Sequence, residues 1–232
     1  LQEAELSTRK AIEIKPDFAE AHSNLGNILK DLGNLQEAEL ATSKAIELDP
    51  NDSNYHSSLG NILKGLGKVK EAESAALRAI ELDPNSASAH SNLGVILRLI
   101  GKLKEAELAT RKAIKIKPDL AEAHLNLGNI LKDLLNLKEA ELSIRKAIEL
   151  NPNLTDAYLN LGNIMRNLGD FGEAIYQYKK ALELNNQLSM AKSGLIETNG
   201  NICNWSNQNI QNIWINNLGI EGSSINPFGL LH

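Results

Sequence analysis

Asparagines recur along this sequence at a constant spacing, and their amide groups could bind a polypeptide backbone. Two columns repeat every 34 residues: the first is Asn24, Ser58, Asn92, Asn126 and Asn160, and the second is Asn27, Asn61, Val95, Asn129 and Asn163. A side-chain amide offers two donors and one acceptor in a plane, which matches the N–H and C=O groups of a peptide. Each bond contributes only about 0.5–1.5 kcal/mol, so we expect binding to need several of them and to select sequence weakly.

A basic column follows the second asparagine column by three residues. Its members are Lys30, Lys64, Arg98, Lys132 and Arg166. These residues are candidates for contact with the same partner, but a solvated charged face is the alternative, with carboxylates such as Asp31 and Asp133 offsetting part of the charge. The asparagines have a similar alternative, because amides in successive units can bond to one another or to water.

Histidines at the same spacing suggest metal binding at first sight. They are His22, His56, His90 and His124. Each belongs to a different unit, beside an apolar stripe, and no His or Cys lies within a ligand-like step of another, so we predict core or interface histidines and no metal site. The segment 65–68 lacks the spacer of a phosphate-binding loop, and no nucleophile–base–acid arrangement occurs in the repeats. We therefore predict no catalytic residue and no cofactor.

The elements that carry these columns are helices. Prolines recur at 34-residue intervals at Pro16, Pro50, Pro84, Pro118 and Pro152. Within one unit, apolar residues from Ala21 to Leu32 have helical spacing, and a second such run extends from Leu35 to Leu48, where Asp49-Pro50 ends it. Asp17 is the predicted N-cap of the first helix, and Gly33-Asn34 is predicted to supply the left-handed residue of the turn.

Each unit is thus a helical hairpin, and hairpins of this size must stack to bury both faces. The predicted fold is an all-α solenoid. Gly26 and Ala38 are placed where the two helices of a hairpin come close, so we predict that Gly128→Leu, at the equivalent glycine, is disruptive. Leu135 replaces the turn glycine of the other units, and Asn136 is the candidate for the left-handed role there.

The period, the Leu-Gly pair of the first helix, the alanines of the second helix and the final proline resemble the tetratricopeptide repeat family. The resemblance covers residues 1–198: a half unit (1–18), five full units (19–52, 53–86, 87–120, 121–154 and 155–188) and a cap-like helix near 189–198. It implies a right-handed superhelix whose first helices line a concave groove. The asparagine and basic columns would then contact a protein or peptide in extended conformation. The lysine or arginine clamp of the chaperone-binding subfamily is absent, since those positions begin with Glu20 and Asn54.

Residues 199–232 differ in composition, being rich in Asn and without Lys or Arg, and one short helix is predicted there. The runs 202–206 and 225–231 resemble the segment that joins the repeats to the catalytic region in O-linked N-acetylglucosamine transferase-like proteins. That resemblance implies a substrate-recruiting region of a glycosyltransferase-like protein, with the transferring domain outside this sequence. The alternatives are a non-enzymatic assembly scaffold, and a repeat array that binds no peptide.

Composition restricts the partners further. The chain has 232 residues and a net charge of −5, which gives no general attraction to nucleic acid or to anionic lipid. No stretch approaches the ~18 apolar residues of a membrane span, and no basic-then-apolar leader occurs, so we expect a cytoplasmic protein. Because Leu1 falls in mid-unit, we expect an uncovered apolar face at that end and end-to-end association through residues such as Leu6.

Overall fold

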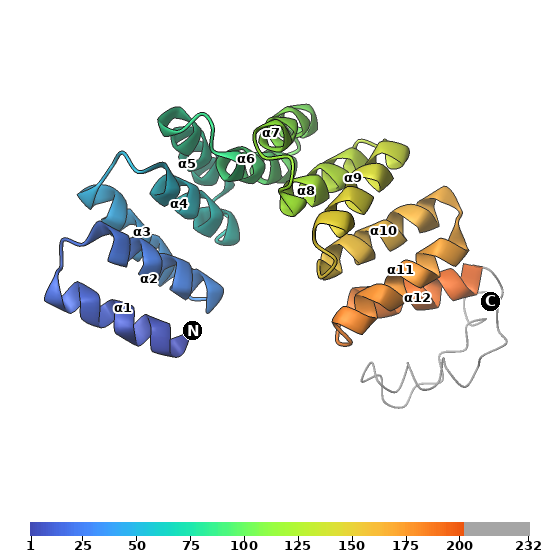
Figure 1. The fold of residues 1–232 in the computed structure, drawn as a ribbon, viewed down its shortest axis with the longest axis horizontal. Coiled ribbons are helices and arrows are strands. Elements are labelled where there is room, and N and C mark those ends of the chain that lie inside the picture. Colours follow the sequence, from blue (N-terminus) through green and yellow to red (C-terminus); the bar gives the residue numbers. More distant parts are fainter. Residues whose placement is uncertain (202–232) are drawn as a thin grey trace, which may run out of the picture. The chain divides into compact units, whose positions relative to one another are not determined.

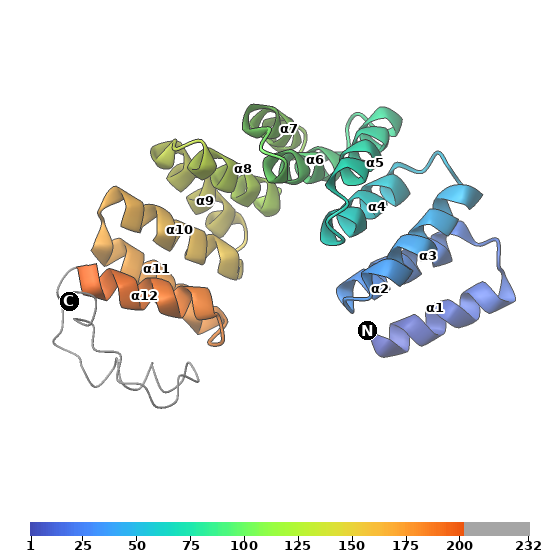
Figure 2. The same ribbon diagram turned by 180° about the vertical axis from the view of Figure 1, so that it is seen from behind.

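The computed structural model describes residues 1–201, and that part of the chain consists of helices without any strand (Figures 1 and 2). The helices are α1 (Gln2–Ile14), α2 (Ala19–Asp31), α3 (Leu35–Leu48), α4 (Ser53–Gly65), α5 (Val69–Leu82), α6 (Ala87–Leu99), α7 (Leu103–Ile116), α8 (Ala121–Asp133), α9 (Leu137–Leu150), α10 (Thr155–Leu168), α11 (Phe171–Leu184) and α12 (Ser189–Asn201). The all-α hairpin fold is therefore confirmed. The helix predicted after residue 199 and the segments with the transferase-like runs lie outside the described residues.

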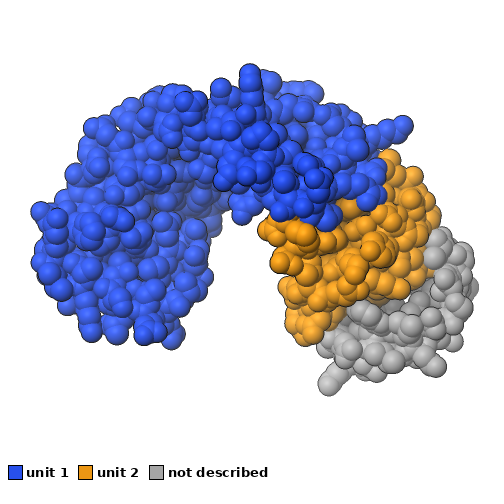
Figure 3. All heavy atoms as spheres, in the orientation of Figure 1, with its two compact units in different colours: residues 1–150 blue, residues 151–232 orange. Residues whose placement is uncertain are grey.

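The chain divides into two compact units, which are coloured separately in Figure 3. Unit 1 is Leu1–Leu150 and contains α1 to α9, and unit 2 is Asn151–His232, of which the described part contains α10 to α12. In each unit, successive helices of a hairpin pack most extensively on each other. Leu6 of α1 and Leu1, which precedes this helix, are exposed, and end-to-end association through them stays a prediction.

The N-terminal caps follow one column of the repeat. Asp52 caps α4 by accepting a bond of 2.7 Å from the backbone N–H of Asn54, and Ser86 caps α6 by accepting one of 3.3 Å from Ala89. The predicted cap Asp17 is wrong, because the N-cap of α2 is Phe18, the residue in the column of Asp52 and Ser86. Asp17 lies one residue earlier, in the turn that the Phe18 N–H closes on the Lys15 carbonyl.

The turns inside the hairpins use a left-handed residue, as predicted. Gly33 has φ 85° and Gly101 has φ 80°. Leu135 itself takes this conformation, with φ 62°, so Asn136 does not have the left-handed role suggested for it. The N–H of Leu135 bonds to the Lys132 carbonyl, as the N–H of Gly33 bonds to that of Lys30, which shows that the hairpin geometry is kept at the cost of an unfavourable leucine backbone.

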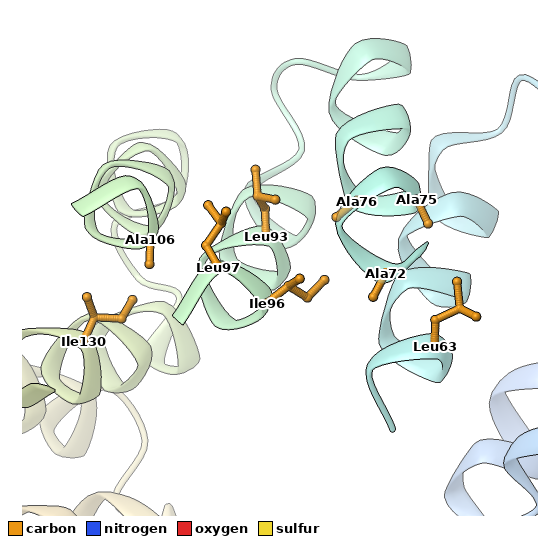
Figure 4. Close-up of a cluster of buried hydrophobic side chains, with 9 residues drawn as sticks. All are labelled: Leu63, Ala72, Ala75, Ala76, Leu93, Ile96, Leu97, Ala106 and Ile130. Carbon is orange, nitrogen blue, oxygen red and sulfur yellow. The ribbon is translucent and has the colours of Figure 1, made fainter. Parts of the chain in front are cut away.

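Small residues allow the two helices of each hairpin to pack closely. The alanines Ala38, Ala72, Ala106 and Ala140 are fully buried. In the middle of unit 1, Leu93, Ile96 and Leu97 of α6 lie among the alanines of α5, Ala106 of α7 and Ile130 of α8 (Figure 4). Alanine and branched aliphatic side chains thus form the core, as the low aromatic content of the sequence indicates.

Candidate polypeptide-binding surface

The polar columns lie on first helices that contact one another. In unit 1, α2 packs on α4, α4 on α6 and α6 on α8, whereas each second helix packs on the first helix that follows it. Figure 1 accordingly shows α5 and α7 farther out in unit 1 than their hairpin partners α4 and α6. The first helices of unit 1 therefore form one continuous inner face. In unit 2, α10 and α12 contact each other in the same way.

Two asparagines of the first column bond across this face to the preceding hairpin. Asn92 Nδ2 donates to Ser57 Oγ at 3.0 Å, and Asn126 Nδ2 donates to Ser91 Oγ at 3.1 Å. Each bond joins two successive first helices and uses one of the two amide hydrogens. The Oδ1 atom and the other hydrogen take no part in these two bonds. Asn24 is exposed on α2, and Asn160 is half-buried on α10 of unit 2.

The second asparagine column is half-buried and varies in its hydrogen bonding. Asn61 Oδ1 accepts from Lys64 Nζ at 3.3 Å, and Asn163 Oδ1 accepts from the Tyr178 hydroxyl at 2.8 Å. Asn129 Oδ1 is buried without a partner, because Ile144 stands where Tyr178 stands in the later hairpin. Asn27 is also half-buried. Asn61 and Asn163 of this column therefore form hydrogen bonds within the protein itself.

Carboxylates neutralise several members of the basic column, as its alternative interpretation predicts. Lys30 lies 3.2 Å from Asp31, Arg98 Nε lies 2.6 Å from Asp133, and Arg166 pairs with Glu197. Among residues 1–201, Lys64 and Lys132 form no ion pair. In this part of the chain, Lys64 and Lys132 are thus the members of the basic column in unit 1 that no carboxylate neutralises.

Lys64 is the more perturbed of these two lysines. Burial lowers the pKa of Lys64 below its usual value, the positive charge of Lys30 lowers this pKa further, and Glu122 opposes both effects. The charges of Lys30 on α2 and Glu122 on α8 thus act in opposite directions on the pKa of Lys64. An anionic group that approached Lys64 would relieve its unfavourable electrostatic environment.

The four histidines form hydrogen bonds between a first helix and the turn that precedes it. His22, His56 and His124 have Nε2 within 2.8–2.9 Å of the carbonyl oxygens of Pro16, Pro50 and Pro118, and His90 lies 3.1 Å from that of Pro84. Since a carbonyl only accepts, Nε2 is the donor. The sequence predicts core or interface histidines, and in the structure the four side chains are half-buried against these turns. The part of the chain that the structure describes holds no cluster of His, Cys, Asp and Glu fit for a metal ion.

Sequence reasoning missed the acceptors Ser57 and Ser91. They lie 35 residues before Asn92 and Asn126, and Ser23 occupies the same column on α2. The periodic serines were a usable signal, but the pairing depends on how far one hairpin turns relative to the next. The constant 34-residue period does not determine the rotation from one hairpin to the next.

The fold and its repeated hairpins define the class of the protein. Family models described as tetratricopeptide repeat match residues 19–52, 121–154, 58–121, 155–188 and 41–74, which together cover most of the chain. The chain belongs to the tetratricopeptide repeat family, and three of the matched segments have the limits expected for the units. Tetratricopeptide repeat proteins mediate protein–protein interactions.

Individual solved structures share this fold. PilF of Pseudomonas aeruginosa is 20% identical with a TM-score of 0.74, over 88% of this chain and 93% of PilF. TTC0263 of Thermus thermophilus is 23% identical with a TM-score of 0.69, over 78% and 98% of the two chains. YrrB, described as a TPR protein with an unusual peptide-binding site, is 24% identical with a TM-score of 0.55, over 79% and 95%.

No curated protein matches the chain significantly. In the described residues, every helix is too short or too polar to cross a bilayer.

Proposed function

We propose that this chain binds extended polypeptide along the inner face of its first helices, with asparagine amides bonding to the peptide backbone. The observation that carries the proposal is the continuous packing of α2, α4, α6 and α8, which brings equivalent polar columns of unit 1 side by side. The YrrB structure supports it only as a relative of the same fold in which peptide binding is described.

The spacing of the helices suits an extended chain. Packed helices lie roughly 8–10 Å apart, and an extended peptide advances about 3.3 Å per residue. Asparagines on successive first helices would therefore meet about every third residue of the ligand. Contacts to backbone groups explain how such a surface would accept many sequences.

The finer part of the proposal is that the module recruits substrates for a glycosyltransferase-like protein. Its support is the resemblance of runs 202–206 and 225–231 to the joining segment of O-linked N-acetylglucosamine transferase-like proteins, and both runs lie outside the described residues. The reading frame after His232 tests this part. A following sugar-nucleotide-binding domain would support it, and an immediate stop codon would contradict it.

A second candidate function is a non-enzymatic assembly scaffold whose asparagines serve the fold. The bonds from Asn92 to Ser57 and from Asn126 to Ser91 favour it, because they give these amides a structural role. The two functions differ in what the loss of the serines does. If the asparagines bind peptide, recognition persists when the serines are removed. In the scaffold function there is no such recognition to retain.

The test uses three proteins on an immobilised array of unbiased peptides. They are the unchanged chain, the triple variant Asn24→Ala, Asn92→Ala and Asn126→Ala, and a control with Ser57→Ala and Ser91→Ala. We expect the triple variant to bind at least about tenfold more weakly, since about three bonds of 0.5–1.5 kcal/mol are lost, while the serine control keeps its affinity. Equal binding by the triple variant would reject the role of the asparagines.

A further inference from the structure

The outer side of unit 1 carries a groove that repeats along the solenoid. One copy lies between α7 and α9 with α8 as its floor, and another lies between α1 and α3 over α2. Each has a volume of about 460 Å³, within the roughly 300–1,000 Å³ range of ligand pockets. This site is separate from the inner face, because second helices form its walls.

The groove contains an exposed apolar strip between its charged side chains. In the α7–α9 groove, Ile114 and Leu142 flank the buried Leu127, and Leu142 is 68% exposed. The α1–α3 groove has Ile12, Leu40 and Leu25 in these places, with Leu40 71% exposed. A large side chain that is exposed in two equivalent grooves is available to cover an apolar group of a partner.

The two grooves differ in charge. Seven of the nine lining positions carry the same residue, and the differences are Glu13 against Lys115 and Ala41 against Ser143. The same position is also glutamate at Glu47, Glu81, Glu149 and Glu183, so Lys115 is the exception among the repeats. The α1–α3 lining contains equal numbers of cations and anions, whereas the α7–α9 lining has an excess of positive charge.

The excess charge is located at Lys115. The groove's other cations have partners, since Arg111 pairs with Glu107 and Glu139, and Lys146 Nζ lies 2.6 Å from Glu149. Within residues 1–201, Lys115 forms no ion pair and stands exposed in the last turn of α7. A carboxylate beside an apolar side chain would match both features of the groove.

We propose that the α7–α9 groove is a second binding site, for a peptide segment in which a large apolar side chain is flanked by carboxylates. The apolar side chain lies against Ile114, Leu127 and Leu142, and a carboxylate pairs with Lys115. The α1–α3 groove does not take this segment, because Glu13 repels the carboxylate. The proposal is independent of peptide binding on the inner face.

The probes are three fluorescein-labelled synthetic peptides of equal length, each with a central Leu-Phe pair flanked on both sides by Glu, by Ser or by Lys. Fluorescence anisotropy with the whole chain measures their affinities. We expect the Glu-flanked peptide to bind most tightly and Lys115→Glu to weaken it by about fivefold or more, with a smaller difference at high salt. Leu142→Ser should also weaken it severalfold, and circular dichroism should show unchanged folding, since both side chains are exposed.

The equivalent groove supplies a matched control. Glu13→Lys gives the α1–α3 groove the charge of the α7–α9 groove. It should create a second binding site, so that two Glu-flanked peptides bind per chain. The variant with Asn92→Ala and Asn126→Ala should bind the Glu-flanked probe as the unchanged chain does, which separates this site from the inner face. The proposal is overturned if the three peptides bind equally, if Lys115→Glu or Leu142→Ser has no effect, or if Leu142→Ser instead abolishes self-association in sedimentation, since the occupant would then be a second copy.

Discussion

At the scale of single residues, one column decides how closely the helices of each hairpin pack. The glycines of the first helices face Thr42, Ala76, Thr110, Ile144 and Tyr178 of the second helices. An added Cβ at Gly128 would overlap Ile144 Cγ1 and lie 3.2 Å from the Ala140 carbonyl oxygen. At Gly60 the nearest atom, the Ala72 carbonyl oxygen, is 3.4 Å away, because Ala76 is small.

These two glycines should therefore respond in opposite directions to alanine. We expect Gly128→Ala to destabilise the chain by about 1–3 kcal/mol through overpacking, and Gly128→Leu to do so more severely. Gly60→Ala should raise the stability by about 0.5–1 kcal/mol, the usual gain within a helix. Urea unfolding measures both variants, and an equal loss of stability in the two would contradict the packing scheme.

The unpaired amide oxygen of Asn129 is a second residue-scale feature. Asn129→Val should raise stability by about 1 kcal/mol, because a buried acceptor without a partner disappears and Val95 already fits this column in α6. Asn61→Val is the control and should lower the melting temperature, since Asn61 Oδ1 accepts from Lys64. A loss of stability in Asn129→Val as large as that in Asn61→Val would show that the oxygen is satisfied in solution.

At the scale of elements, the turn between α8 and α9 stores strain at Leu135. Its side chain is 83% exposed, so it has little packing to offset the left-handed backbone. We expect Leu135→Gly to raise the free energy of unfolding by about 0.5–1 kcal/mol. Gly101→Ala should lower it by a similar amount, because a Cβ there meets nothing within 4 Å and only the backbone is strained. Thermal melts that show no change in either variant would exclude this explanation.

The elements themselves follow from the sequence because each depends on local spacing. The apolar stripe from Ala21 to Leu32 and the proline at residue 50 were enough to predict α2 and α3. Asp17 failed because two polar caps in other repeats, Asp52 and Ser86, mark a column one residue later. Contacts between hairpins, such as Asn126 with Ser91, depend on the rotation from one hairpin to the next, which local spacing does not determine.

The outer groove could not be predicted for the same reason. The exposed leucines Leu40 and Leu142 have only polar residues three and four positions away along their helices, a pattern that predicts exposure but not a groove. They are exposed because second helices pack on the neighbouring first helices and not extensively on one another. The sequence does show that lysine replaces glutamate at Lys115. That this residue gives one groove an excess of positive charge follows only once the groove is known.

At the scale of the molecule, unit 1 behaves as a linear array in which each hairpin contacts its neighbours. Stability in such an array is approximately a sum of hairpin and interface contributions. Removal of one whole hairpin should therefore leave the others folded, provided that the new interface joins equivalent residues. Deletion of residues 87–120, which contain α6 and α7, meets this condition because the period is constant.

The deletion brings Asn126 into the place of Asn92, where it can donate to Ser57 as Asn92 does. We expect a cooperative helical protein with a lower melting temperature and a urea m-value reduced roughly in proportion to the residues removed. Peptide affinity on the inner face should weaken by the contribution of the asparagine of one first helix. The Glu-flanked probe should lose its site entirely, since Lys115 is deleted. A chain that loses helical signal per residue or unfolds without cooperativity would show that α6 and α7 support unit 1 beyond their immediate neighbours.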